Sequence, residues 1–94
     1  MTADADPMEA LRGRFRDRLA AERAALAEAV ERSDRETFRA ICHRIAGAGG
    51  MFGFADLSQL ASRVEEAIDA GVACRDLREP VAQLLSDIDD ATRA

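Results

Sequence analysis

The 94-residue sequence contains no lysine, tryptophan or tyrosine, and its only aromatic side chains are four phenylalanines. Aromatic and β-branched residues favour strands, whereas alanine, which occurs 20 times, is the best helix former. No stretch reaches the ~20 apolar residues of a membrane span, and the first residues lack the basic and apolar regions of a signal peptide. We therefore expect a helical protein of the cytoplasm that does not cross a membrane.

Basic residues are fewer than acidic ones, and there are only two cysteines. All 13 basic residues are arginines, and 18 acidic residues outnumber them, which gives a net charge of −5. This sign disfavours nucleic acids and anionic membrane surfaces as partners. Cys42 and Cys74 form no CxxC pattern, so we expect them to fill the core rather than to form a disulfide. With one histidine and no cysteine pair beside it, we expect no metal site and no bound cofactor.

Four stretches repeat apolar residues every three or four positions, which is typical of helices with one buried face. They begin at about residues 7, 34, 56 and 77, and the second and third end at about 52 and 70. The expected boundary signals are a capping box from Ser33 to Glu36, Asp56 with Gln59, Gly71 as a stop, and Pro80 in a first turn. Residues 1–6 are expected to form a disordered tail before a single domain over 7–94. The predicted fold class is all-α, an antiparallel up-down four-helix bundle.

The second predicted helix contains three glycines, although glycine inside a helix costs about 0.5–1 kcal/mol relative to alanine. On a helical wheel, Gly49 lies on the core face, where close approach to a neighbouring helix explains it. The other members of that face are Phe38, Ile41, Cys42, Ile45 and Phe52. Gly47 and Gly50 point outwards, at about 180° and 120° from the core direction, and leave a strip of surface almost without side chains.

The only histidine, His43, lies about 140° from the core direction of the same helix and therefore points outwards. Gly47 follows it by one turn and Gly50 by two, so another surface can come close to the ring. Cys42 turns inwards, which excludes a cysteine and histidine pair, whereas neutral imidazole is itself a nucleophile at physiological pH. A solvated histidine beside glycines and a hydrogen-bonded core histidine are the alternatives.

The run His43-Arg44-Ile45-Ala46-Gly47-Ala48-Gly49-Gly50-Met51-Phe52-Gly53 resembles the histidine-containing phosphotransfer (HPt) domain family. That family carries a histidine, an apolar residue two positions on, then Lys-Gly, small residues and a later glycine, on the second long helix of a bundle. The resemblance implies that His43 accepts a phosphoryl group from a receiver-domain aspartate and passes it to another. It also implies that Gly47 admits the receiver's active site and that Gly53 serves helix termination or packing.

Ala46 and Ala48 depart from the family pattern, which commonly has a lysine at the first position and frequently a small hydroxyl residue at the second. Because phosphoryl transfer depends on charge neutralisation, Arg39 is the best local substitute for the lysine and Arg44 the next. Either is equally explained as an ordinary surface arginine.

A partner for the second ring nitrogen can be sought by reflecting the second helix through the turn near residue 54. This operation places Glu65 opposite His43, where it would fix the tautomer of the ring, with Ser62 as a weaker candidate. A solvated surface carboxylate is the alternative interpretation of Glu65.

The leading hypothesis is a histidine phosphotransfer protein that relays a phosphoryl group between receiver-domain aspartates in a two-component phosphorelay. We expect a monomer without kinase activity of its own, with receiver domains and a hybrid histidine kinase as partners and the metal ion on the receiver only. The alternative is a degenerate HPt-like module that binds a receiver or a histidine kinase without carrying phosphate, because Ala46 replaces the usual lysine. A third hypothesis is a helical bundle that self-associates through its alanine-rich and glycine-rich faces.

Overall fold

The helices of the computed structural model lie close to where the sequence predicts them. The structure describes residues 7–93, which form α1 (Pro7–Glu31), α2 (Arg35–Met51), α3 (Ala55–Asp69) and α4 (Arg78–Arg93). A short 3₁₀ helix, η1 (Cys74–Leu77), leads into α4, and Pro80 lies in the first turn of α4 as predicted. The tail predicted for residues 1–6 lies outside the described residues.

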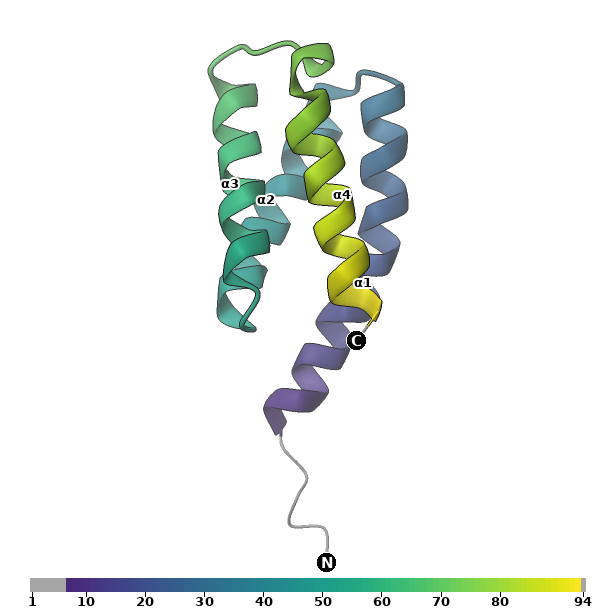
Figure 1. Cartoon of the computed structure of the whole chain (residues 1–94), viewed down its shortest axis with the longest axis vertical. Helices are drawn as coiled ribbons and strands as arrows, with labels where there is room; N and C mark the ends of the chain where they lie inside the picture. The colour runs from purple at the N-terminus through teal and green to yellow at the C-terminus, as the bar shows by residue number, and fades with distance from the viewer. Residues whose placement is uncertain (1–6, 94) are drawn as a thin grey trace, which may run out of the picture.

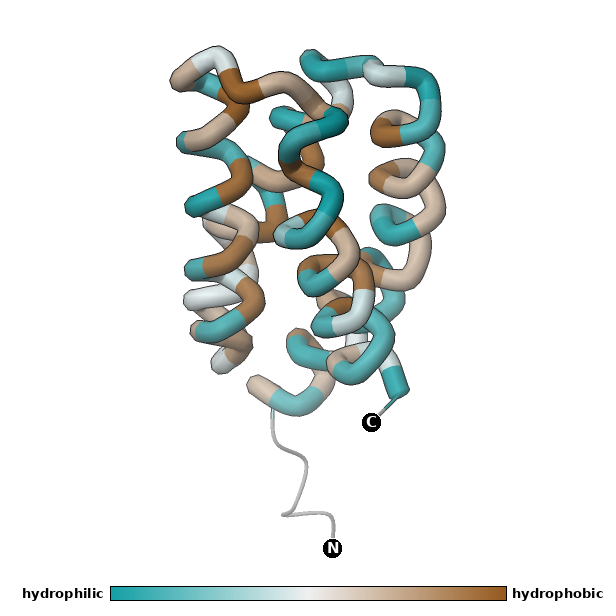
Figure 2. The backbone as a smooth tube through the Cα atoms, turned by 45° about the horizontal axis from the view of Figure 1, so that its top comes forward, coloured by the Kyte–Doolittle hydropathy of each residue, from teal (hydrophilic) through white to brown (hydrophobic). Residues whose placement is uncertain are grey.

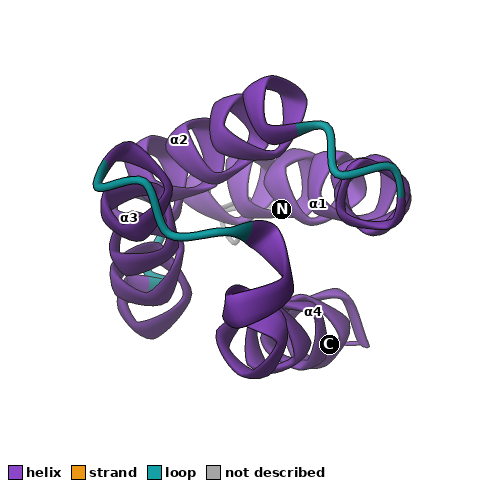
Figure 3. Cartoon of the chain, turned by 90° about the horizontal axis from the view of Figure 1, so that it is seen from above, coloured by secondary structure: helices purple, strands orange, loops and turns teal. Residues whose placement is uncertain are grey.

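Consecutive helices run in opposite directions (Figure 1) and occupy the corners of a bundle when seen from above (Figure 3). Around the bundle, α2 lies between α1 and α3, and α4 packs against both α1 and α3. The part of the chain from 7 to 93 contains no strand. The all-α, up-down four-helix bundle predicted from the sequence is therefore confirmed.

Three helix ends are closed by the same backbone hydrogen bond, from an amide to the carbonyl five residues earlier. The residue before each of these amides has a positive φ, as this type of C-cap requires. These residues are Ser33, Gly53 and Gly71, with φ of 54°, 89° and 91°. Gly53 and Gly71 thus end α2 and α3 in a conformation that costs glycine little free energy. Ser33 adopts the same conformation at a higher cost, because it has a side chain.

The capping box expected at Ser33 is wrong by one residue. Ser33 belongs to the closing turn of α1, and the N-cap of α2 is Asp34, whose carboxylate accepts a hydrogen bond from the amide of Thr37 at 3.2 Å. Hydrogen bonding by the side chain of Thr37, and then by its backbone amide, lowers the pKa of the Asp34 carboxyl group. The start predicted at Asp56 is also late, since α3 begins at Ala55 without a side-chain cap.

The core is formed by one face of each helix, and apolar and polar positions alternate along the chain accordingly (Figure 2). The core face predicted for α2 is confirmed, with Phe52 half-buried and its other members buried. A Cβ atom on Gly49 would lie 3.2 Å from Cβ of Ser58 and 3.3 Å from the carbonyl oxygen of Phe54. Glycine at this position therefore lets α2 and α3 approach closely.

The first turns of α1 project beyond the rest of the bundle (Figure 1). Met8 and Leu11, which the apolar pattern assigns to the core face, are 38% and 40% exposed for this reason. The buried part of α1 begins at Phe15, whose ring lies 5.4 Å from that of Phe52 and 5.3 Å from that of Phe54. The lower end of the bundle is thus held by an aromatic cluster from α1 and the α2–α3 turn.

Candidate functional site

His43 lies in the middle of α2, and its side chain is 70% exposed. Its neighbour Cys42 is fully buried, so Cys42 faces the core and His43 faces solvent. This arrangement agrees with the helical wheel and rules out the alternative of a core histidine.

The Nδ1 atom of His43 lies 2.9 Å from Oε2 of Glu65 on α3. Only 14% of the Glu65 side chain is exposed, so this carboxylate lies in the seam between α2 and α3. An ionised carboxylate accepts hydrogen bonds and does not donate them, so Nδ1 carries the proton. The lone pair of the neutral ring is therefore on Nε2, which is the nitrogen left for chemistry.

Arg39 is the cation that the structure brings to this site. Its Nη2 atom lies 3.3 Å from Oε2 of Glu65, the same oxygen that contacts His43. Its Nε atom lies 2.5 Å from Oδ1 of Asp69, and Nη2 lies 3.3 Å from Oδ2. Hydrogen bonding to Asp69 raises the pKa of Arg39, and the same bond lowers the pKa of Asp69. Both residues stay charged at neutral pH.

Arg44 and Ala46 are engaged elsewhere. Nε of Arg44 lies 2.7 Å from Oε1 of Glu22 on α1, so this arginine ties α2 to α1 rather than facing Glu65. The carbonyl oxygen of Ala46 accepts a hydrogen bond from the hydroxyl group of Ser58 at 2.5 Å. This bond joins α2 to α3 within one turn of His43.

The surface beside His43 is open. No atom outside the local helix lies within 4 Å of a Cβ built on Gly47, and the nearest to one on Gly50 is the Ser58 hydroxyl oxygen at 3.6 Å. Met51, which follows Gly47 by one turn, is 69% exposed. This surface of α2, which we call the glycine strip (Gly47, Gly50 and Met51), gives a partner access to the ring and offers one apolar contact.

Three residues of this site, Ser58, Asp69 and Met51, were not predicted from the sequence. The positions of two of them follow from helical spacing, because Asp69 follows Glu65 by one turn and Met51 follows Gly47 by one turn. Ser58 depends on the close packing of α2 on α3 and could not be placed without the structure. Ser62, the weaker candidate for the partner of Nδ1, does not have this role, because Glu65 contacts that nitrogen.

Cys42 lies behind His43 in the core, and Cys74 is half-buried in η1; both are free thiols. Burial raises the pKa of the Cys42 thiol to about 12, and the negative charges of Glu65 and Glu22 act in the same direction. Cys42 is thus a packing residue, as the sequence predicts.

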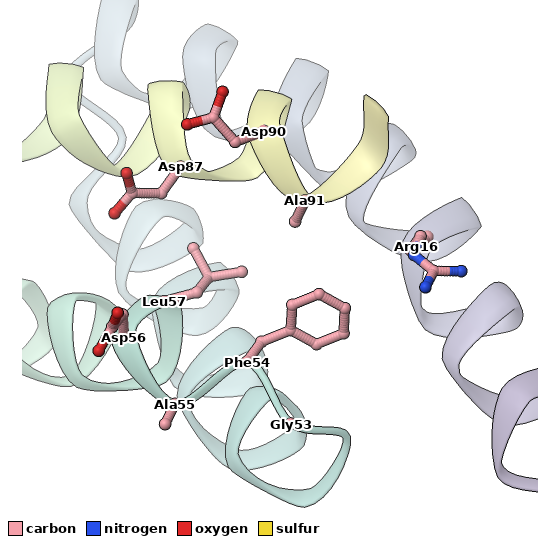
Figure 4. A pocket seen from close by; sticks show the side chains of 9 residues that line it. All are labelled: Arg16, Gly53, Phe54, Ala55, Asp56, Leu57, Asp87, Asp90 and Ala91. Atoms are coloured by element: carbon pink, nitrogen blue, oxygen red, sulfur yellow. The ribbon is translucent and has the colours of Figure 1, made fainter. Parts of the chain in front are cut away.

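A cleft of about 540 Å³ lies away from His43, between α1, the start of α3 and the end of α4 (Figure 4). Phe54 and Leu57 line it together with Arg16, Asp87 and Asp90, and none of the residues around His43 does. His43 is therefore presented on an open helical surface, which suits a macromolecular partner better than a small molecule enclosed in a pocket.

Two kinds of feature are absent from residues 7–93. No group of three or more His, Cys, Asp and Glu side chains is placed to hold a metal ion. None of the helices in this range combines the length and the apolar character needed to cross a membrane.

Fold and site together define an all-α bundle with one exposed histidine, held by a carboxylate, on a glycine-lined helix. Residues 10–94 match the Hpt domain, so the chain belongs to the Hpt domain family. This family is associated with histidine phosphotransfer in phosphorelays, where its members interact with receiver domains and kinases. No match was found among curated proteins or among solved structures.

Proposed function

We propose that this protein carries a phosphoryl group on Nε2 of His43 and relays it between receiver-domain aspartates of a two-component phosphorelay. The observation that carries the proposal is the hydrogen bond from Nδ1 to Glu65, which leaves the Nε2 lone pair on an exposed surface. The glycine strip beside the ring supports it, since a receiver must bring its phosphoaspartate close to that atom.

Transfer to the protein is an in-line displacement at phosphorus. The Nε2 lone pair forms the P–N bond, and the P–O bond to the receiver aspartate breaks, with its electron pair returning to the carboxylate. The ring becomes a cation with its proton on Nδ1, and the Glu65 carboxylate stabilises this charge through the hydrogen bond. In the onward step a second aspartate attacks phosphorus, and the electron pair of the P–N bond returns to Nε2.

Several further properties belong to the same proposal. The protein acts as a single domain over residues 7–94, as a monomer in the cytoplasm, with receiver domains and a hybrid histidine kinase as partners. It has no kinase activity and no cofactor of its own, and the receiver supplies the metal ion. Glu65 supports the ring, Arg39 is the nearest cation, and the glycine strip is the docking surface.

The experiment is transfer from receivers charged with a small phosphodonor, tested one receiver at a time. The chain is expected to gain phosphate that is labile in acid and stable in alkali, as for a phosphorus–nitrogen bond, and the His43→Gln variant is expected to gain none. Equal labelling of wild type and His43→Gln overturns the proposal.

One observation favours the degenerate module as a second candidate. Ala46 stands where the family commonly has a lysine, and Arg39, the nearest substitute, is already paired with Asp69. For such a module, receiver binding would survive His43→Ala, and no receiver would label the wild-type chain.

A further inference from the structure

Asp69, a carboxylate outside the family motif, is the principal partner of Arg39. The Asp69 carboxylate accepts from Nε of the guanidinium at 2.5 Å and from Nη2 at 3.3 Å, whereas Oε2 of Glu65 lies 3.3 Å from Nη2. Asp69 ends α3, and Arg35 fixes this end by donating to the carbonyl oxygens of Ile68 and Val72 at 2.7 Å each. The side chain that holds Arg39 thus stands on an anchored part of the backbone.

Arg39 and His43 compete for one oxygen atom. Oε2 of Glu65 lies 2.9 Å from Nδ1 of His43 and 3.3 Å from Nη2 of Arg39. Hydrogen bonds weaken as they lengthen, so in this arrangement Glu65 serves mainly the ring and Asp69 serves mainly the guanidinium. Loss of Asp69 would leave the Arg39 charge with Glu65 as its remaining carboxylate partner among these residues.

We propose that Asp69 is a positioning residue that restrains Arg39, holding its contact with Glu65 to the longer distance of 3.3 Å in the resting protein and keeping the guanidinium away from a phosphoryl group on Nε2 in the phosphorylated one. Arg39 precedes His43 by one turn of α2, the spacing at which side chains on one helix meet. A phosphoryl group brings about 1.5–2 negative charges, which attract a guanidinium strongly. Asp69 therefore keeps Arg39, the nearest substitute for the lysine that Ala46 replaces, from pairing with the phosphoryl group.

The restraint sets the lifetime of the phosphohistidine, and this part of the inference rests on the proposed function. In hydrolysis, the oxygen of water attacks phosphorus, the P–Nε2 bond breaks with its electron pair left on the ring, and the departing phosphate carries the two protons of the water. The transition state is loose, and the negative oxygens of the phosphoryl group help to expel the ring. A guanidinium paired with those oxygens withdraws that electron density, so releasing Arg39 is expected to slow the loss of phosphate.

The test measures the half-life of the phosphorylated chain after loading with phosphoramidate, a small phosphodonor that needs no partner protein. We expect Asp69→Asn to lengthen the half-life by about threefold, the size of effect that a solvent-exposed ion pair gives. The same substitution in an Arg39→Gln background is expected to have no effect, and Asp69→Glu is expected to behave as wild type. The thermal unfolding midpoint of each variant controls for a structural effect.

An unchanged half-life in Asp69→Asn overturns the inference. An equal change in the Arg39→Gln background also overturns it, because loss of the Asp69 charge would then act on the phosphoryl group without Arg39. If phosphoramidate and charged receivers both fail to load the wild-type chain, the proposed function fails separately. The restraint is then judged on the unloaded protein by ¹⁵N NMR of the imidazole. A smaller share of the Nδ1–H tautomer in Asp69→Asn, abolished by Arg39→Gln, supports the restraint, and an unchanged share overturns it.

Discussion

At the residue scale, one hydrogen bond decides which nitrogen of His43 can react. Glu65 is mostly covered by its neighbours, and its contact with Nδ1 is a charge-assisted hydrogen bond when the ring is a cation. In the proposed transfer this bond is stronger with the phosphorylated, cationic ring than with the neutral resting ring, so the proposal gives Glu65 a part in lowering the barrier as well as in orienting the ring.

Replacing the Glu65 carboxylate by an amide tests this role. Glu65→Gln keeps the size of the side chain and an oxygen that can accept from Nδ1, but it removes the charge that stabilises the phosphorylated ring. We expect the rate of phosphoryl transfer from a receiver to fall about tenfold, as for other groups that orient a reactive histidine. A time course of phosphate transfer from the receiver, with samples quenched at intervals, measures this rate.

The neighbouring residue provides the matched control. Glu66→Gln makes the same chemical change at an exposed position on α3, and transfer at the wild-type rate is expected. A rate for Glu65→Gln equal to that of Glu66→Gln would show that the carboxylate does not act on the ring.

Cys42 behaves differently from Cys74 because it is fully buried behind His43. Burial raises the pKa of this thiol to about 12, so the reactive thiolate is scarce in the folded protein near neutral pH. We expect a thiol reagent to modify only Cys74 in the native chain and both cysteines after denaturation. Modification of Cys42 in the native chain at the rate of Cys74 would show that the core beneath His43 opens.

At the scale of elements, the site depends on how tightly α2 and α3 pack. Gly49 removes the side chain that would separate them, and the hydroxyl group of Ser58 bonds across to the carbonyl of Ala46. This close approach puts Glu65 and Asp69 of one helix within hydrogen-bonding distance of His43 and Arg39 of the other. The register of one helix pair therefore sets the whole network.

The end of α1 offers a prediction on stability. Ser33 has a φ of 54°, a conformation that costs a residue with a side chain about 1 kcal/mol or more relative to glycine. Ser33→Gly is expected to raise the free energy of unfolding by about 1 kcal/mol, because the strain in the folded state disappears. Chemical denaturation measures this free energy. Gly71→Ala introduces the same strain at the end of α3 and is expected to lower the free energy of unfolding. A Ser33→Gly protein less stable than wild type would contradict this explanation.

The glycine strip on α2 is expected to be a docking surface rather than a structural feature. A side chain at Gly47 meets no atom within 4 Å in the free protein, and leucine is the better helix former. Gly47→Leu is therefore expected to keep or raise the unfolding temperature while lowering phosphotransfer from a receiver by at least about tenfold. Transfer is measured as for the wild type.

Gly13→Leu is the matched control, since Gly13 lies in α1 and a Cβ there also meets nothing within 4 Å. That variant is expected to transfer normally. Normal transfer by Gly47→Leu as well would contradict docking over the strip.

At the scale of the whole molecule, His43, the proposed phosphoryl acceptor, lies on an open surface, and the cleft described above belongs to another part of the bundle. Such a surface supplies orientation and one stabilising charge, while the phosphoryl donor and its metal ion come from the partner in the proposed relay. A small bundle is sufficient for this part of the reaction, because its helices need only hold a few side chains in fixed positions around His43.

Much of this organisation is predictable from the sequence because it follows from helical periodicity. The outward direction of His43, the inward direction of Cys42 and the close approach at Gly49 all come from counting residues along one helix. The opposition of His43 and Glu65 follows from reflecting that helix through a short turn. The partners of Arg39 and Arg44 do not follow, since long side chains have several carboxylates within reach and only the packed structure selects among them. The cap at Ser33 was misassigned because local patterns do not reveal which of two adjoining helices uses a residue.

The most direct test of the central claim locates the phosphorus atom after transfer from a charged receiver. Heteronuclear NMR of ¹⁵N-labelled protein shows which imidazole nitrogen is coupled to phosphorus. The hydrogen bond between Nδ1 and Glu65 predicts a single phosphoryl group on Nε2 of His43. Phosphate on Nδ1, on a residue other than His43, or on no residue after exposure to every candidate receiver would contradict it.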